Sequence, residues 1–426
     1  MSSVRTIIVL AAAIILAELS AFAVKPVAVQ RWSYQTSGAD AAGWTSGHGI
    51  PSLDGKSAIT FEGMSPVFRK YGKREYLAVS NITAGDAFSF TLPVRKLPKG
   101  TPVDFGLQIG TEKGGPSDWV CEYRCGKKWI PAGSFTVKRD SKVDDTEWFT
   151  TFTLAKPVKG ELCVRVRAAS KPARLKSAVY LLPSPYCTAY LAAWPVGEYD
   201  TKKVLCIGNS FTYFGSSFFA MAEIARSQGH SLQIVVNTKG GQNFGQHLGL
   251  ERSCKAMEEG GYDVALMQNQ SMAGAFYASD SVNYAYLKDD AVAIAAKVRE
   301  HSPKVRMILE RTWAYPTSNG GWKGYGSAEA FDADLQKGSE ALAEAMGAEL
   351  SPIGNAFIKG RELGLPVYWT DSFHQSWLGA YLKACVNYLM IFGEPFSGFV
   401  SNYNQNPAQA ALCREIASET VFPGII

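Results

Sequence analysis

Residues 204–212 read V-L-C-I-G-N-S-F-T, and this stretch decides the fold class of the second half of the 426-residue chain. Four apolar residues end abruptly at a Gly-Asn pair, Ser210 follows, and an amphipathic pattern begins a few residues later. This order predicts a buried strand, a tight turn and the start of a helix. Ser210 would then present its hydroxyl at the carboxyl end of a strand. The alternative is that Ser210 only caps the helix that follows.

Strand-like and helical patterns alternate from residue 200 to the C-terminus. Such alternation indicates βαβ units, and therefore a parallel sheet with helices on both faces. Ligands of such sheets bind outside the carboxyl ends of the strands, which is where Ser210 is expected. The expected strands cover residues 204–207, 232–236, 263–267, 306–310 and 349–353, and the expected helices cover 216–228, 243–259, 282–301, 328–346 and 377–392.

Residues 27–195 have the pattern of an all-β domain. Short runs of strand-forming residues are divided by turns rich in Gly, Pro, Asp and Lys, which predicts a sandwich of the jelly-roll type. One interpretation is a carbohydrate-binding accessory module in which exposed tryptophans stack on sugar rings, and the other is that these tryptophans fill the core. The candidates are Trp32, Trp44, Trp119, Trp129 and Trp148. The expected strands cover 57–61, 76–79, 88–92, 103–109, 119–123, 148–154 and 162–166.

Residues 1–23 have the pattern of a secretory signal peptide. Arg5 precedes an apolar run over 7–16, and an A-x-A sequence follows at 21–23. The run is short for a membrane span, and no cysteine stands at the expected cleavage point, so neither a stable membrane anchor nor a lipid anchor is predicted there. We therefore expect an exported protein, periplasmic or secreted. The net charge of +5, without a long basic run, excludes a nucleic-acid-binding footprint.

Eight cysteines in an exported chain permit disulfides. Cys206 lies in the expected central strand and is predicted to be a core thiol. Cys121 and Cys125 would be about 13 Å apart on one strand, too far to pair with each other. Pairing of either with Cys163 or Cys187 stays open. The C-x3-C spacing has no matching His or Cys pair, so the sequence predicts no metal site and implies no cofactor.

Two further loops follow expected strands and carry polar chemistry. Gly240 and Gly241 stand after the second strand, where paired glycines let the backbone approach a substrate and aim an N–H group at it. Gln268, Asn269 and Gln270 follow the third strand, and any of their amides could donate to a developing oxyanion. The alternatives are an ordinary turn for the glycines and polar capping of the next segment for the amides.

Asp371 and His374 stand three residues apart immediately before the last expected helix. A carboxylate in this relation can hold the imidazole at Nδ1 and leave Nε2 free to take a proton from a serine. Among the five histidines, His374 alone has an acid so placed in an expected C-terminal loop. Together with a serine after a strand, a glycine loop and an amide loop in this order, the pair predicts a serine hydrolase.

These motifs give residues 203–398 a resemblance to the SGNH (GDSL-like) hydrolases, and in particular to a branch with I-G-N-S-F-T, here 207–212, and D-x-x-H-x-S, here 371–376. The resemblance implies a flavodoxin-like three-layer α/β/α fold and the hydrolysis of esters, often acyl groups on carbohydrates. By matching positions, Ser210 would be the nucleophile, His374 the general base and acid, and Asp371 the residue that orients the histidine. The backbone N–H groups of Ser210 and Gly241 would form part of the oxyanion hole.

The chain departs from the family pattern at two places. Asn209 stands where the family name has Asp, and the third motif lacks the usual Gly-x-Asn-Asp. Asn269 is the first choice for the side-chain oxyanion donor, with Gln268 or Gln270 as alternatives. Gln268 is also a candidate for substrate binding, and Trp313, after the fourth strand, is expected either to form a sugar-facing wall or to pack in the core.

The favoured hypothesis is an exported serine esterase of two domains, 27–195 and 200–426, that removes acyl groups, acetyl first, from small-molecule or glycan esters. A second hypothesis is a catalytically silent glycan-binding protein that retains the hydrolase fold. A third is an esterase or thioesterase acting on lipids, which the lack of an evident apolar lid in the sequence disfavours. A fold hosts many functions, so the choice among the three depends on the site.

Overall fold

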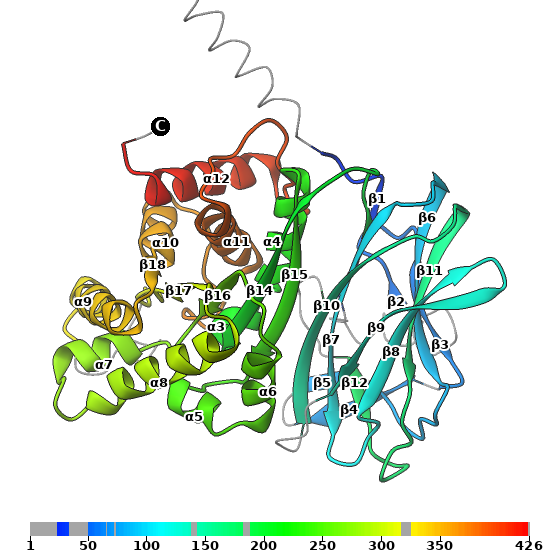
Figure 1. Ribbon diagram of the computed structural model, residues 1–426, viewed down its shortest axis with the longest axis horizontal. Helices are drawn as coiled ribbons and strands as arrows, with labels where there is room; N and C mark the ends of the chain where they lie inside the picture. Colours follow the sequence, from blue (N-terminus) through cyan, green and yellow to red (C-terminus); the bar gives the residue numbers. More distant parts are fainter. Residues whose placement is uncertain are drawn as a thin grey trace, which may run out of the picture.

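The computed structural model describes residues 24–33, 50–64, 66–71, 74–137, 143–181, 188–316 and 325–424. An α/β half and an antiparallel half lie side by side (Figure 1). The expected signal peptide at 1–23, Trp44 and Cys187 lie outside the described residues. Among the residues that are described, none of the helices combines the length and the apolar character that crossing a membrane requires.

The α/β half is built on a five-stranded parallel sheet in the order β15-β14-β16-β17-β18. In chain order this is 2-1-3-4-5, the doubly wound order of flavodoxin-like folds, whose switch point lies between the first and third strands. The α/β fold with a parallel sheet is confirmed. Ser210 follows the first strand at the switch point. The strands are β14 (Asp200–Gly208), β15 (His230–Thr238), β16 (Val264–Met267), β17 (Arg306–Glu310) and β18 (Glu349–Ser351).

Helices cover both faces of this sheet, and β14 is accordingly apolar on both. Val204 and Cys206 share one core with α4 and α11, whereas Leu205 and Ile207 share another with α6, α8 and α9. The helices are α3 (Ser210–Tyr213), α4 (Ser217–Ser227), α5 (Phe244–Leu248), α6 (Glu251–Glu259), α7 (Ala273–Ser279), α8 (Ala285–His301), α9 (Ala328–Met346), α10 (Ile353–Glu362), α11 (Trp377–Phe392) and α12 (Pro407–Val421).

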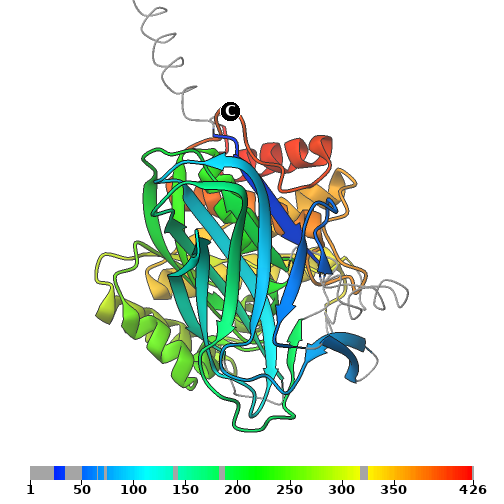
Figure 2. The same ribbon diagram turned by 90° about the vertical axis from the view of Figure 1, so that its right-hand side faces the viewer.

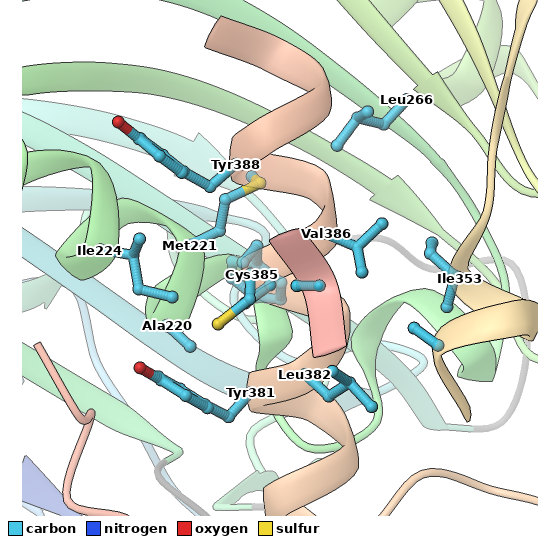
Figure 3. Packing of buried hydrophobic residues seen from close by; sticks show 14 of the residues in the cluster. Ala220, Met221, Ile224, Leu266, Ile353, Tyr381, Leu382, Cys385, Val386 and Tyr388 are labelled. Carbon is cyan, nitrogen blue, oxygen red and sulfur yellow. The ribbon is translucent and has the colours of Figure 1, made fainter. Parts of the chain in front are cut away.

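Helix α11 is buried along most of its length. Figure 3 shows its Tyr381 and Cys385 on the side of the α4 residues Ala220 and Met221, and its Leu382 on the side of Ile353. Burial raises the pKa of the Cys385 thiol well above its usual value, so the thiol stays protonated. Because α11 begins directly after the segment with His374, its packing fixes that segment against the core.

The helix boundaries differ from the expectation in three respects. The helix expected at 243–259 is two helices, because Gly249 ends α5 and Leu250 is extended. The strand expected at 349–353 stops at Ser351, since Pro352 precedes α10. Helices α7, α10 and α12 were not predicted, although Asn406 followed by Pro407 is a recognisable helix start.

The antiparallel half consists of two sheets that enclose a shared core, seen from the side away from the α/β half in Figure 2. Phe90 of one sheet meets Phe105 of the other edge to face, with ring centroids 5.0 Å apart. One sheet has the order β1-β13-β7-β12-β5-β4 with β10 also paired to β7, and the other β2-β3-β6-β11-β8-β9. The strands are β1 (Ala28–Trp32), β2 (Ile50–Pro51), β3 (Ala58–Glu62), β4 (Pro66–Tyr71), β5 (Arg74–Val79), β6 (Ala87–Leu97), β7 (Pro102–Glu112), β8 (Asp118–Cys125), β9 (Lys128–Thr136), β10 (Val143–Thr153), β11 (Val158–Ala168), β12 (Val179–Leu181) and β13 (Ala189–Ala193).

The tryptophans of this half separate into two groups. Trp32 and Trp119 are fully buried, and Trp148 packs on the core. Trp129 is half-buried and lies under the guanidinium of Arg165, 4.0 Å from the ring centroid. Of the described candidates, Trp129 is therefore the one left for stacking on a ligand.

Strand pairing decides the open disulfide question for Cys163. Tyr123 of β8 stands directly opposite Val164 of β11, so the two side chains share a face. Cys121 and Cys125 lie on that face, whereas Cys163 lies on the other, because successive residues of a strand alternate. Neither pairing with Cys163 can form, and the three cysteines are free thiols.

Candidate active site

The structure brings Ser210, His374 and Asp371 into one hydrogen-bonded chain. The Ser210 hydroxyl lies 2.8 Å from His374 Nε2, and His374 Nδ1 lies 2.7 Å from an Asp371 carboxylate oxygen. A carboxylate only accepts, so Nδ1 carries the ring proton and Nε2 is left to take the proton of the serine. The other Asp371 oxygen accepts from the backbone N–H of Phe373 and of His374, at 3.1 and 3.0 Å. The carboxylate is therefore held in place from three directions.

A tight turn and its neighbour Gln375 place the histidine. Ser372 adopts a left-handed φ of +67°, and the His374 carbonyl accepts from the Trp369 N–H at 2.8 Å, which closes the turn. Gln375 is buried and donates to the carbonyls of Phe211 and Phe214. Phe211 is the second residue of α3, which begins with Ser210, and Phe214 is the residue that follows this helix. This amide links the histidine segment to the serine segment. Sequence analysis missed Gln375, because its partners lie more than 160 residues away.

Aromatic rings enclose the imidazole of His374. Phe214 stacks on it with centroids 4.6 Å apart and an interplanar angle of 21°, and Phe373 lies 4.2 Å away. Phe211 meets it edge to face at 5.5 Å. These contacts restrict the ring to one orientation. The electron-rich faces of Phe214 and Phe373 also favour the imidazolium form of the ring if it takes up a second proton.

Among the three amides after β16, Asn269 is the one with an unused donor. Its side-chain oxygen accepts from the backbone N–H of Phe244 at 3.2 Å and of Gln270 at 2.8 Å. Its Nδ2 is buried and has no hydrogen-bond partner among the described residues. A buried donor left unpaired costs about 1–3 kcal/mol, and an oxyanion beside it would supply the missing acceptor. The Gln270 amide nitrogen, in contrast, lies 3.4 Å from the Ser271 hydroxyl.

Gln268 supports the nucleophile turn and does not face a substrate, which corrects the expectation that it binds one. It is 1% exposed, and its oxygen accepts from the Asn209 N–H at 2.9 Å and the Thr212 hydroxyl at 3.0 Å. Its nitrogen donates to the Asn269 carbonyl. Gly208 makes this approach possible, because a Cβ there would lie 2.1 Å from the Thr212 hydroxyl and 2.8 Å from the Gln268 oxygen.

Asn209 joins all three loops of the site. Its side-chain oxygen accepts from the Phe211 N–H at 3.1 Å, and its Nδ2 donates to the carbonyls of Gln242 at 3.1 Å and Asn269 at 3.3 Å. A carboxylate at this position could not donate to either carbonyl. Asn209, which stands where the SGNH pattern has Asp, therefore fits the two loop carbonyls that accept from its amide. This departure from the pattern is the sequence feature that could have identified Asn209 as a link between the loops.

The glycine loop lies against the nucleophile turn. Lys239 donates its N–H to the Gly208 carbonyl at 3.0 Å, and Gly241 follows with a φ of +72° that favours glycine. Within the described residues, the backbone N–H groups of Gly241 and Ser210 donate to no protein group. Together with Asn269 Nδ2, the site therefore offers three unpaired donors.

Trp313 is a core residue, so the expectation of a sugar-facing wall is not met. It is 1% exposed and stacks between Phe211 and Phe357, with centroids 4.4 and 4.1 Å away. Its indole N–H donates to the Phe373 carbonyl at 2.8 Å. Trp313 thus supports the segment that carries His374 from inside the core.

A buried ionic group lies below the nucleophile segment. Lys383 of α11 donates to the Phe211 carbonyl and to a Glu310 oxygen, each at 2.7 Å, and Asn387 donates to the other Glu310 oxygen at 2.6 Å. Lys383 is 1% exposed. Sequence analysis missed this group, although a lysine in an otherwise apolar helix is a signal that its charge has a buried partner.

Comparisons with protein-family profiles and with curated proteins each found no match. Solved structures with a related fold include a DUF4886 family protein from Bacteroides uniformis, at 19% identity, covering 53% of this chain and 96% of that one, with a TM-score of 0.43. A protein from Slackia heliotrinireducens described as an SGNH hydrolase matches at 19% identity over 44% of this chain and 98% of its own, with a TM-score of 0.36. An acetyl xylan esterase from Geobacillus stearothermophilus matches at 17% identity over 48% of this chain and 99% of its own, with a TM-score of 0.35.

Proposed function

We propose that this protein is an exported serine esterase that removes acyl groups, acetyl first, from carbohydrate esters. One observation carries the proposal: the hydrogen-bonded chain Ser210–His374–Asp371 stands in a site with three donors for which the described residues supply no acceptor. A nucleophile, a base with a fixed tautomer and free oxyanion donors are the parts that acyl transfer needs.

The reaction follows from these positions. As Ser210 Oγ attacks the ester carbonyl, His374 Nε2 takes its proton, and Asp371 stabilises the imidazolium through Nδ1. The carbonyl oxygen becomes an oxyanion that accepts from the N–H groups of Ser210 and Gly241 and from Asn269 Nδ2, each contributing about 3 kcal/mol. The imidazolium then protonates the leaving alcohol. Water, deprotonated by His374, attacks the acyl-serine, and collapse releases the carboxylic acid and restores the hydroxyl.

The rim of the site supports a sugar as the alcohol. Phe214 and Trp369 are half-buried and lie edge to face beside His374, with centroids 6.2 Å apart. Lys239 and Gln242, in the glycine loop, are also partly exposed. Aromatic faces next to hydrogen-bonding groups suit a sugar ring better than an acyl chain of a lipid. Export follows from the leader pattern of residues 1–23, and we take residues 27–195 to be a β-sandwich accessory domain.

The test is acetate release from p-nitrophenyl acetate and from acetylated glycans by the wild type and by Ser210→Ala. We expect the loss of the nucleophile to lower kcat by several orders of magnitude. Ser217→Ala is the matched control, because it removes a buried hydroxyl that donates only to the Thr212 carbonyl. Negligible release by a folded wild type would overturn the esterase proposal in favour of a silent glycan-binding protein. Faster turnover of long-chain esters than of any acetylated sugar would instead favour a lipid esterase.

A further inference from the structure

The antiparallel half packs tightly on α4 and β15 of the α/β half (Figure 1). Gly106 of β7 makes the close approach possible, because a Cβ there would lie 2.2 Å from the ring of Phe219 in α4. Tyr190 of β13 stacks on the same ring, with centroids 6.1 Å apart. Asp104 and Arg226 form an ion pair across the interface at 2.9 Å, and both side chains are buried. One hydrophobic core of the α/β half therefore extends across the interface to Phe149, Tyr190 and Trp194 of the antiparallel half.

At the end of this interface nearest the site, two polar side chains of the antiparallel half reach the catalytic loops. Glu147 of β10 accepts a hydrogen bond from the Thr238 hydroxyl at 2.6 Å, and both residues are buried. Thr238 ends β15, three residues before Gly241. Gln108 of β7 donates to the carbonyl of Tyr213 at 3.3 Å. Tyr213 is the last residue of α3, the short helix that begins with Ser210.

We propose that Glu147, assisted by Gln108, is a positioning residue for the oxyanion hole, so that the antiparallel half forms part of the active site; this rests on the proposed esterase function. The glycine loop needs such an anchor. The loop is held at Lys239 by the Gly208 carbonyl and at Gln242 by Asn209, whereas Gly240 and Gly241 between them carry no side chain, and a Cβ at Gly241 would meet nothing within 4 Å. Restricting the backbone of such residues costs conformational entropy, which contacts outside the glycine pair must offset.

The anchor lies at the base of this loop. The Thr238 side chain is held by Glu147, and the Thr238 carbonyl accepts from Arg252 at 3.0 Å. Loss of the Glu147 carboxylate would leave the buried Thr238 hydroxyl without this acceptor. The end of β15 would then lose its hydrogen bond to the antiparallel half. A displacement of an oxyanion donor by about 1 Å is enough to lower the rate about a hundredfold.

The test compares Glu147→Ala with Glu147→Gln in the full chain. We expect Glu147→Ala to lower kcat about tenfold to a hundredfold while KM changes less than about twofold, because the donor acts on the transition state. Glu147→Gln recovers most of the loss, since its amide oxygen accepts the same hydroxyl. A kcat of Glu147→Ala equal to the wild-type value, or a loss that Glu147→Gln does not recover, would overturn the proposal.

Thr151→Val is the matched control. Thr151 lies four residues along the same strand, about 13 Å away, and accepts an interface hydrogen bond from Arg226 at 2.8 Å. Loss of the Thr151 hydroxyl weakens the interface but removes no contact of the catalytic loops, so kcat of Thr151→Val should stay within about twofold of wild type. If Thr151→Val and Glu147→Ala lower kcat equally, and their kcat losses parallel the decreases in their melting temperatures, Glu147 contributes to the stability of the fold and does not position the oxyanion hole.

Amide hydrogen exchange over residues 238–243 separates this proposal from the esterase proposal. We expect faster exchange in Glu147→Ala than in the wild type, and no change in Thr151→Val, because local opening of the loop sets the rate. A wild type that hydrolyses no ester but shows this exchange pattern would refute the esterase and keep the positioning role. Unchanged exchange in Glu147→Ala would refute the positioning role whatever the activity.

Discussion

Asn269→Asp tests the oxyanion donor with little change in shape. The carboxylate keeps an oxygen for the backbone N–H groups of Phe244 and Gln270, at 3.2 and 2.8 Å in the wild type, so the loop retains its anchors. The group exchanged is Nδ2, which is buried and has no partner among the described residues. The variant therefore removes the donor that we assign to catalysis and places an acceptor where it stood.

The expected loss of kcat in Asn269→Asp follows from the burial of the Asn269 Nδ2 donor. An oxyanion donor of this kind contributes about 2.7–4 kcal/mol to the transition state, or about a hundredfold to a thousandfold in kcat. The new oxygen of Asn269→Asp also faces the oxyanion with like charge, so we expect a kcat reduction of about a thousandfold, at the upper end of that range. KM should change less than about threefold, because the neutral ester carbonyl gains little from the donor.

The assay is steady-state hydrolysis of p-nitrophenyl acetate, with thermal unfolding to confirm that each variant is folded. Gln270→Glu is the matched control, since it adds the same charge one residue along, at a side chain whose nitrogen lies 3.4 Å from the Ser271 hydroxyl. We expect it to retain kcat within about threefold of wild type. If folded Asn269→Asp turns over at a similar rate, or if Gln270→Glu loses as much, the assignment of Asn269 is refuted.

Three other changes probe the surroundings of the nucleophile. Phe214→Leu removes the ring stacked 4.6 Å from His374 and should lower kcat about threefold to tenfold by losing about 1 kcal/mol of cation–π stabilisation; an unchanged kcat in steady-state kinetics would contradict this. Lys383→Met leaves Glu310 buried without its cation and should lower the free energy of unfolding in urea by about 3–5 kcal/mol, whereas a loss below about 1 kcal/mol would show that the charge is solvated. Burial raises the pKa of Tyr315 to about 12. The stability that its protonated phenol provides is therefore complete below about pH 10 and is lost as the pH rises toward 12, so wild type should lose stability relative to Tyr315→Phe between about pH 10 and pH 12; a constant difference would refute this.

The triad could be predicted from the sequence because each member stands in a local pattern with its own meaning. Ser210 follows an apolar strand run, and Asp371 and His374 share one turn. Asn269 was the first choice as the oxyanion donor, but the sequence left Gln268 and Gln270 open as alternatives, because all three carry the same amide. Hydrogen-bond partners brought in by other segments decide which nitrogen stays unpaired.

Trp313 shows the same limit for aromatic residues. A tryptophan after a strand is compatible with both a binding wall and a core, and its own neighbours in the chain do not distinguish the two. The rings of Phe211 and Phe357, far from it in sequence, enclose it and settle the matter. Phe214 and Trp369, which carry no distinctive motif, lie at the rim instead.

The alternation of strands and helices, the parallel sheet and the motifs that contain Ser210, Asp371 and His374 could be recognised in the sequence, because hydrophobic periodicity and turn residues act over a few residues. Only the tertiary structure decided which groups meet across long separations. Glu147 and Thr238 are 91 residues apart, and Lys383 and the Phe211 carbonyl are 172 apart. Such pairs form because a buried polar group must find a partner, and the packing of whole sheets and helices determines which partner is within reach.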